Sequence, residues 1–185
     1  MQIRDATEAD VPAIAQILNA AIENTTADWE TLPQSLVERR VWLSSRRRAG
    51  HPVIVADDGA DGVVGWASYG PFRNRSGFAL TVEHSVYVAE RARSGGVGGA
   101  LLDELIARAT AAGMHVIVGG LDADNTASLR FHARHGFITV GRMPEVGHKF
   151  GRWLDLVLVQ RVLQAGDPSG PPRPSVSTES PPKTA

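Results

Sequence analysis

The sequence predicts one α/β domain in which helices flank a mixed β-sheet. Its 185 residues correspond to about one domain. Hydrophobic residues make up 43% of the chain, which is enough to bury a core. Runs rich in β-branched and aromatic residues alternate with segments whose apolar residues recur at helical spacing. In order, these segments are a strand, two helices, three strands, a helix, a strand, a helix and two strands.

Each element is predicted by a local signal. Thr7 and Asp10 form a weak capping box before the first helix, and three arginines, interpreted as a solvated helix end, close the second. Glycine- and aspartate-rich residues 58–62 form the turn of a β-hairpin. Residues 143–152 are expected to be a loop. The expected strands are residues 2–4, 52–57, 63–69, 81–88, 115–121, 137–142 and 153–160, and the expected helices are residues 7–22, 33–48, 100–112 and 127–135.

Composition excludes several classes of function. A net charge of −1 and a pI of about 6.6 provide no field that attracts nucleic acid or a membrane surface. We expect no metal, because no His/Asp/Glu pair has metal-ligand spacing. There is no cysteine, no apolar run that could span a bilayer and no visible signal peptide, so a cytoplasmic location is expected. The domain is predicted to cover residues 1–165, and residues 166–185, rich in Pro and Ser, to be a disordered tail.

A glycine-rich segment joins the strand at 81–88 to the helix at 100–112. Such a loop leaves N–H groups free at a helix N-terminus, where the helix dipole favours an anion. A P-loop is excluded because no Lys follows the glycines, and the dinucleotide fingerprint is excluded because Leu101 replaces its third glycine. A plain glycine-rich turn remains the structural alternative. The glycines are Gly95, Gly96, Gly98 and Gly99.

The strand at 81–88 carries a carboxylate at its middle. Strand alternation places Thr81, Glu83, Ser85 and Tyr87 on one face. A carboxylate among apolar residues is costly unless it has a partner or a task. Glu83 would suit a general base that deprotonates an amine, with its pKa raised by partial burial. The alternative is a structural glutamate held in a salt bridge.

Two motifs and the order of the elements resemble the GCN5-related N-acetyltransferase (GNAT) superfamily, whose members bind acetyl-CoA. The first is Arg93-x-x-Gly-x-Gly98, and the second runs from Asn125 to Phe137. The resemblance implies a mostly antiparallel central sheet, splayed at the strand that binds acetyl-CoA. Gly95 departs from the pattern, because the family often has a basic residue there. The residues implied to bind acetyl-CoA are Val86, Tyr87, Val88, Arg93, Ser94, Gly95, Gly96, Val97, Gly98, Gly99, Asn125 and Arg134.

The second motif also suggests an acid. His132 stands where many family members have a tyrosine that protonates the leaving CoA thiolate, and a histidine can serve because its pKa is near neutral. The alternative is a histidine that only packs on the cofactor. Asn125 is implied to touch the pantetheine arm, and it can also cap the following helix.

Residues 81–88 and 145–155 together resemble the phosphinothricin and methionine sulfoximine/sulfone acetyltransferases. Members acetylate small amino-acid analogues and are typically homodimers. The loop of Lys149 and Phe150 would then reach a neighbouring subunit's site. For Arg73 and Arg75, ordinary solvation of a surface loop is the alternative. Related chains often carry an aromatic residue at the position of Arg75. The implied acceptor-binding residues are Arg73, Asn74, Arg75, Glu83, His84 and Ser85.

The predicted function is direct acetyl transfer from acetyl-CoA to the α-amino group of such an analogue, with Glu83 as base, acting directly or through a water. No cysteine is present to carry an acetyl group, and Ser85 is the remaining alternative for a covalent carrier. One alternative is an acetyltransferase for an antibiotic amine or a protein N-terminus. Another is a non-catalytic regulator that binds acyl-CoA, which would not need Glu83. Trp29, in a polar loop, would either contact the substrate or cover the edge of the core.

Overall fold

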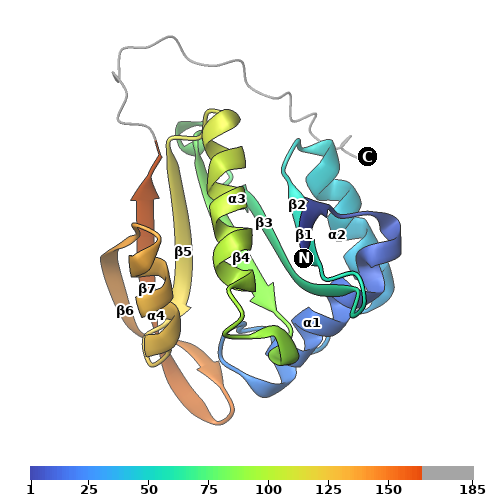
Figure 1. Ribbon diagram of the computed structural model, residues 1–185. Coiled ribbons are helices and arrows are strands. Elements are labelled where there is room, and N and C mark those ends of the chain that lie inside the picture. The colour runs from blue at the N-terminus through green and yellow to red at the C-terminus, as the bar shows by residue number, and fades with distance from the viewer. Residues whose placement is uncertain (164–185) are drawn as a thin grey trace, which may run out of the picture.

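The computed structural model describes residues 1–163, so the predicted tail at 166–185 lies outside the described residues. One seven-stranded sheet has the order β1-β2-β3-β4-β5-β7-β6 (Figure 1). This architecture confirms the predicted fold class and element order. The elements are β1 (Gln2–Asp5), α1 (Val11–Asn24), α2 (Leu36–Arg48), β2 (Val53–Asp57), β3 (Val63–Pro71), β4 (Thr81–Val88), α3 (Val97–Ala111), β5 (Val116–Asp122), α4 (Thr126–Arg134), β6 (Ile138–Lys149) and β7 (Arg152–Val162), with short 3-10 turns at Glu8–Asp10, Ser76–Phe78 and Glu90–Ala92.

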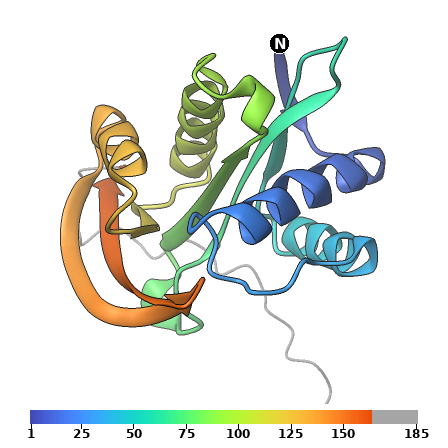
Figure 2. The ribbon, with the colours of Figure 1, turned by 90° about the horizontal axis from the view of Figure 1, so that it is seen from below.

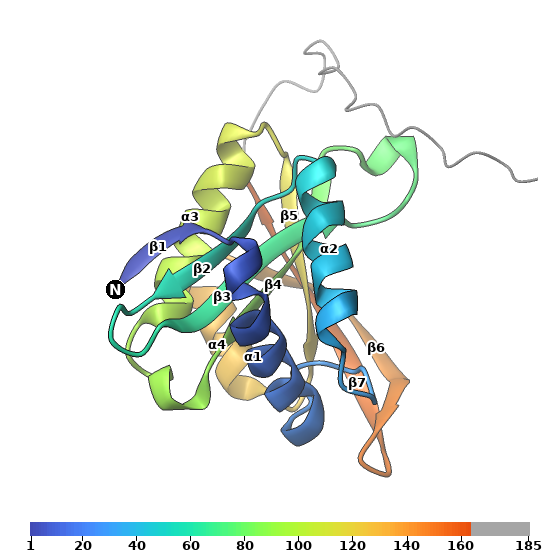
Figure 3. The ribbon, with the colours of Figure 1, turned by 90° about the vertical axis from the view of Figure 1, so that its right-hand side faces the viewer.

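Helices cover both faces of the sheet. Helices α1 and α2 lie on one face, and α3 and α4 lie on the other (Figures 2 and 3). Each face has its own core. Leu101 and Leu105 of α3 are fully buried on one side, and Ile14 and Ile22 of α1 are almost fully buried on the other. Burial of these amphipathic helix faces is the main force that holds the three layers together.

The sheet opens between β4 and β5. Neighbouring strands pair antiparallel throughout, except that β4 and β5 are parallel. β4 pairs with β3 from Val82 to Val88, but it pairs with β5 only from Thr81 to Glu83. Beyond Glu83 the two strands diverge, so the β5-facing edge of β4 is left without a strand partner. The predicted splay at residues 81–88 is therefore confirmed.

Three helix starts differ from the prediction. α1 begins at Val11 instead of residue 7, because Glu8–Asp10 form a 3-10 turn. α2 begins at Leu36 instead of residue 33, because Ser35 caps it. The Ser35 hydroxyl accepts a hydrogen bond from the Glu38 N–H (3.2 Å), and the Glu38 carboxylate accepts one from the Ser35 N–H (2.7 Å). α3 begins at Val97 instead of residue 100, because Gly96 adopts a left-handed conformation (φ 80°) at the N-cap. The glycines at 98 and 99 thus belong to the first helical turn.

The predicted loop at 143–152 is wrong. β6 continues to Lys149, and β7 begins at Arg152 after a two-residue turn. Both turn residues, Phe150 and Gly151, have positive φ (51° and 72°), which matches the right-handed twist of a tight hairpin. The register of β6 and β7 shifts between Met143 and Gly147. This bulge accommodates a proline and a glycine within the strand, which is why the sequence resembles that of a loop.

Candidate active site

Two cavities lie along β4. The large cavity has a volume of about 760 Å³ and contains the split between β4 and β5. The small cavity, of about 410 Å³, lies on the side of α1 and α2. Ser85 and Tyr87 line both, so the cavities adjoin at this strand. A reaction between two bound molecules could therefore take place across β4.

Backbone groups dominate the large cavity. It is lined by the N-terminus of α3, the free edge of β4 and the glycines of β5 at 119 and 120. The first turn of a 15-residue helix provides N–H groups that suit phosphate, and the free edge of β4 provides N–H and C=O groups that suit a peptide-like arm. The cavity thus fits a long molecule that carries phosphate at one end and amides further along.

The structure brings together most residues predicted to bind acetyl-CoA. All of them except Gly95 and Val97 line the large cavity. Val97 is buried in the core, and Gly95 is exposed. The Asn125 side chain accepts a hydrogen bond from the Ser128 N–H (3.0 Å), so it caps α4 from the wall of this cavity.

Two buried histidines face each other in the wall of the large cavity. The Nε2 atoms of His84 and His132 are 3.0 Å apart. Nδ1 of His84 lies 2.7 Å from the Val118 carbonyl, and Nδ1 of His132 lies 2.8 Å from the Ser128 carbonyl. A carbonyl only accepts, so each Nδ1 carries a proton and the two Nε2 atoms have room for one proton between them. Burial lowers the pKa of both rings.

Glycine at 119 provides the space for this pair. A Cβ atom there would lie 2.6 Å from Cε1 of His84. His84 therefore points to the α3 and α4 face of β4, opposite to Glu83. From the sequence, His84 is predicted to lie in the acceptor pocket with Glu83. In the structure His84 instead lines the large cavity, because neighbouring strand residues point to opposite faces.

Glu83 lies in the small cavity as an unpaired carboxylate. It is half-buried, and within residues 1–163 it makes no hydrogen bond or ion pair. Burial raises its pKa above the ordinary value, and the charges of Arg73 and Arg46 act in the opposite direction. A Cβ atom on Gly120 would be 3.6 Å from Glu83 Oε1, so the carboxylate lies at the split in the sheet. These observations remove the structural salt bridge as an explanation for Glu83.

The small cavity includes residues that the sequence analysis missed. The Asp28 carboxylate accepts a hydrogen bond from the Tyr87 hydroxyl (2.6 Å). Arg39, Trp42 and Arg46 project from one face of α2 at helical spacing. This helical spacing could have predicted that the three side chains share a face. It is easily overlooked because the arginines at the end of the helix are interpreted as solvated. The remaining lining residues are Leu18, Trp29, Glu30, Gln34, Trp66 and Ser68.

The predicted loop residues do not line this cavity. Arg73, Asn74 and Arg75 are exposed, and none of them lines either cavity. The Arg73 guanidinium stacks on the Phe72 ring (4.2 Å to its centre) and donates to the Phe72 carbonyl (3.0 Å). Their role in acceptor binding stays a prediction, since Arg73 lines neither cavity but its charge acts on the pKa of Glu83.

The C-terminal hairpin supports the segment between α1 and α2. The Lys149 ammonium, almost fully buried, donates to the Thr25 carbonyl (2.9 Å) and to the Asp28 carbonyl. Trp29 occupies the space left by Gly147, where a Cβ atom would be 2.4 Å from its ring. Lys149 thus holds a wall of its own chain's cavity, and Trp29 both packs on β6 and lines that cavity.

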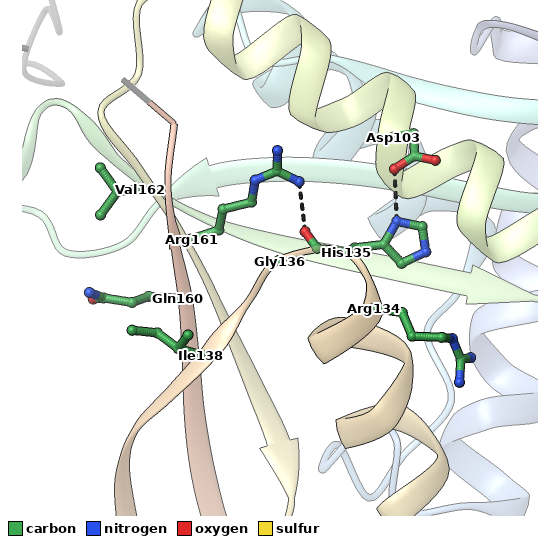
Figure 4. A pocket seen from close by; sticks show the side chains of 8 residues that line it. All are labelled: Asp103, Arg134, His135, Gly136, Ile138, Gln160, Arg161 and Val162. Atoms are coloured by element: carbon green, nitrogen blue, oxygen red, sulfur yellow. Dashed lines mark hydrogen bonds and ion pairs between the residues drawn. The ribbon is translucent and has the colours of Figure 1, made fainter. Parts of the chain in front are cut away.

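A third hollow, of about 630 Å³, lies outside α4 (Figure 4). His135 Nδ1 is 2.7 Å from the Asp103 carboxylate, and Arg161 donates to the His135 carbonyl (2.6 Å). Its central polar groups are therefore already paired, and Arg134 points away from them (Figure 4). Among residues 1–163, no group of three or more His, Asp or Glu could hold a metal, and no helix is long and apolar enough to cross a membrane.

Comparison with known proteins identifies the family of the chain. Residues 14–137 match the model of the acetyltransferase (GNAT) family. The chain belongs to this family. By that membership the protein is an N-acetyltransferase, and the matched residues include the strand, glycine turn and helix around the large cavity.

Three proteins that are similar to the chain indicate the activities found among its relatives. The L-methionine sulfoximine/L-methionine sulfone acetyltransferase of Pseudomonas aeruginosa is 51% identical over 85% of this chain and 92% of its own. A phosphinothricin acetyltransferase from Sinorhizobium meliloti, solved with acetyl-CoA, is 35% identical with a TM-score of 0.90, covering 97% and 98% of the two chains. A ribosomal-protein-alanine N-acetyltransferase from Brucella melitensis is 49% identical with a TM-score of 0.86, covering 88% and 99%.

Proposed function

We propose that this protein transfers an acetyl group from acetyl-CoA to the α-amino group of a small amino-acid analogue of the methionine sulfoximine, methionine sulfone or phosphinothricin type. The observation that carries the proposal is Glu83, an unpaired carboxylate at the split between β4 and β5. The backbone-lined large cavity supports the choice of acetyl-CoA. The names of the relatives from Pseudomonas aeruginosa and Sinorhizobium meliloti support the choice of acceptor.

In this reaction Glu83 removes the proton that an amine carries at neutral pH, either directly or through a water. Its raised pKa brings the carboxylate closer to the working pH, which makes it a better base. Backbone N–H groups on the free edge of β4 would stabilise the negative charge that develops on the acetyl oxygen. The transfer is direct from thioester to amine, since the chain contains no cysteine.

We assign the proton for the leaving thiolate to His132. The proton released would be one held between the facing Nε2 atoms of His84 and His132, and because burial lowers the pKa of both rings, the protonated pair is a strong acid that gives it up readily. Replacement His132→Phe keeps the ring volume and removes this proton. We expect kcat to fall about 100-fold, the lower end of the range for a lost general acid. A decrease of less than threefold would restrict His132 to packing.

The alternative acceptor is a protein N-terminus, as in the name of the relative from Brucella melitensis. The volume of the small cavity, about 410 Å³, favours a small molecule. Thiol release from acetyl-CoA, measured with methionine sulfone, methionine sulfoximine, phosphinothricin, common amino acids and an alanine-terminated peptide, tests the choice. The proposal expects turnover on one of the three analogues. Turnover on the peptide alone supports the alternative, and binding of acetyl-CoA without turnover on any of these amines contradicts both choices of acceptor.

We also propose a homodimer. The terminal strand β6 and the adjoining hairpin expose Ile138, Val140, Phe150 and Trp153, which are 48–63% accessible. An edge strand with exposed apolar side chains favours pairing with another chain. Light scattering of the wild type should give twice the mass of the monomer. The double variant Ile138→Lys/Trp153→Lys should have the mass of one monomer. A wild-type chain that remains a monomer at high micromolar concentration contradicts this proposal.

A further inference from the structure

Arg39 of α2 is buried without a partner. Its side chain is only 7% exposed, and it lines the small cavity. Its Nε atom has no hydrogen-bond partner, and in the part of the chain that the structure describes the guanidinium makes no hydrogen bond or ion pair. It lies against the Trp42 ring, 4.3 Å from the ring centre. A stacked ring compensates only part of the cost of burying a charge.

Arg46 lies two turns along the same helix and is also unpaired. Its Nε atom is buried without a partner, and its guanidinium makes no hydrogen bond or ion pair within residues 1–163. The guanidinium lies on the backbone of β3 at Gly70, where a Cβ atom would be 1.5 Å from Nη1. Gly70 is the cross-strand partner of Glu83. The Arg46 cation is therefore adjacent to the proposed base.

Other arginines with buried or half-buried surroundings are paired. Arg4 binds the carboxylates of Asp10 and Asp57, each at 2.7 Å, and Arg108 binds Glu104 at 2.8 Å. Burial instead lowers the pKa of Arg39 and Arg46, and the nearby carboxylates, chiefly Asp28 for Arg39 and Glu83 for Arg46, compensate only part of the lost hydration. A buried cation is costly unless a partner compensates it, and here that partner has to come from a ligand.

We propose that Arg39 and Arg46 form a receptor for the anionic and oxygen-bearing groups of the acceptor. This inference rests on the proposed function and defines its substrate class. An amine that faces Glu83 has its α-carboxylate one carbon away, which places the carboxylate at Arg46. Arg39 is seven residues earlier, roughly 10 Å along the helix axis. It therefore binds the oxygens at the far end of the acceptor, such as those of a sulfone, sulfoximine or phosphinate. A guanidinium suits all of these groups.

The test compares three acceptors at saturating acetyl-CoA: methionine sulfone, its carboxamide and methionine. The wild type should prefer the carboxylate over the carboxamide, and the sulfone over methionine, each by about 10- to 150-fold, the value of a hydrogen bond to a charged group. Arg46→Met should reduce the first ratio to within threefold of unity, and Arg39→Met should do so for the second. The KM for acetyl-CoA should stay unchanged in both.

Two controls separate this role from others. Arg40→Met changes an exposed arginine on the same helix and should preserve both ratios. Arg73→Met tests the loop that the sequence favoured, and it should also preserve them. The melting temperatures of Arg39→Met and Arg46→Met should equal or exceed that of the wild type, because each variant removes an unpaired buried charge. A structural arginine would instead lower the melting temperature.

The inference and the proposed function can fail separately. If the wild type acetylates amines but both ratios survive in the two variants, or if Arg73→Met alone abolishes them, the receptor is wrong and the acetyltransferase stands. If the wild type acetylates none of the analogues, the proposed function is wrong. Calorimetric binding of methionine sulfone to the CoA-bound protein then tests the receptor: a loss confined to Arg39→Met and Arg46→Met supports it, and equal binding by all variants overturns it.

Discussion

The two cavities along β4 use opposite means of recognition. The large cavity presents backbone: a helix N-terminus, glycines and the free edge of a strand. The small cavity presents charged and aromatic side chains from α2, β4 and the segment before α2. Backbone recognition suits a ligand that is the same throughout a family, whereas side chains are replaced easily. The difference indicates that the donor is held by the fold and the acceptor by a changeable set of residues.

The largest expected effect falls on the residue at the boundary. Glu83→Gln keeps the shape and removes the base, so kcat/KM for the acceptor should decrease by about 10²- to 10⁴-fold. In the wild type, activity should fall as the pH drops through the raised pKa of Glu83, because the base becomes protonated, and the variant should lose this limb of the profile. Steady-state kinetics from about pH 5 to about pH 8, where most proteins are most stable, measures both effects.

Glu90→Gln is the matched control, since Glu90 is an exposed glutamate beyond the end of β4. It should leave the rate and the pH profile unchanged. If Glu83→Gln left the pH profile of activity unaltered, Glu83 would not be the base, and the small cavity would not provide the acid–base chemistry.

The donor side is tested by Gly98→Ala. A Cβ atom at 98 would meet Val88 and Phe131 at ordinary contact distances of 3.5 and 3.7 Å, so the core should accept it. Replacing a helical glycine should raise stability by about 0.5–1 kcal/mol. A methyl group at the helix N-terminus would nevertheless keep a phosphate away from the backbone, so the affinity for acetyl-CoA should fall about tenfold, or about 1.4 kcal/mol. Calorimetry and thermal melting measure the two changes. Unchanged affinity would show that the pyrophosphate binds elsewhere.

The acceptor side is tested without changing a charged residue. Gly70→Ala places a methyl group where the Arg46 guanidinium lies, so the guanidinium must move. We expect the KM for the acceptor to rise about five- to tenfold, about 1 to 1.4 kcal/mol, with the KM for acetyl-CoA unchanged. Gly77→Ala is the control, because a Cβ atom there meets nothing within 4 Å. Equal acceptor KM values in both variants would contradict the location of the acceptor next to Gly70.

The smallest catalytic effect is expected far from both cavities. Arg4 holds the pKa of Asp10 at about 2, below the ordinary value of 3.8. Stability from this pair is present above the unfolded-state pKa and is lost as the pH falls toward 2. Asp10→Asn should therefore destabilise the protein by about 1–2 kcal/mol at pH 7, after allowance for solvent screening, and by less at pH 3. Urea unfolding measures this difference, and kcat should be unchanged. A pH-independent loss would mean that the carboxylate acts through packing.

The sequence predicted the donor side better than the acceptor side for a physical reason. The residues of the strand, turn and helix are contiguous, so the anion site can be predicted from local spacing alone. The acceptor side depends on which face of α2 is buried. Val37 and Val41 are more than 60% exposed while Arg39 faces inward, which reverses the usual hydrophobic pattern. Only the packed structure shows that Gly70 leaves the space in which Arg46 lies.

The contact between Lys149 and the Thr25 carbonyl joins positions 124 residues apart. During synthesis, the segment that lines the small cavity leaves the ribosome long before the hairpin that supports it. Contacts with such a large separation form late, because a long loop must close first. A nascent chain would therefore complete its donor site while the acceptor site was still open, and the enzyme would become selective only after its last strand pair had docked.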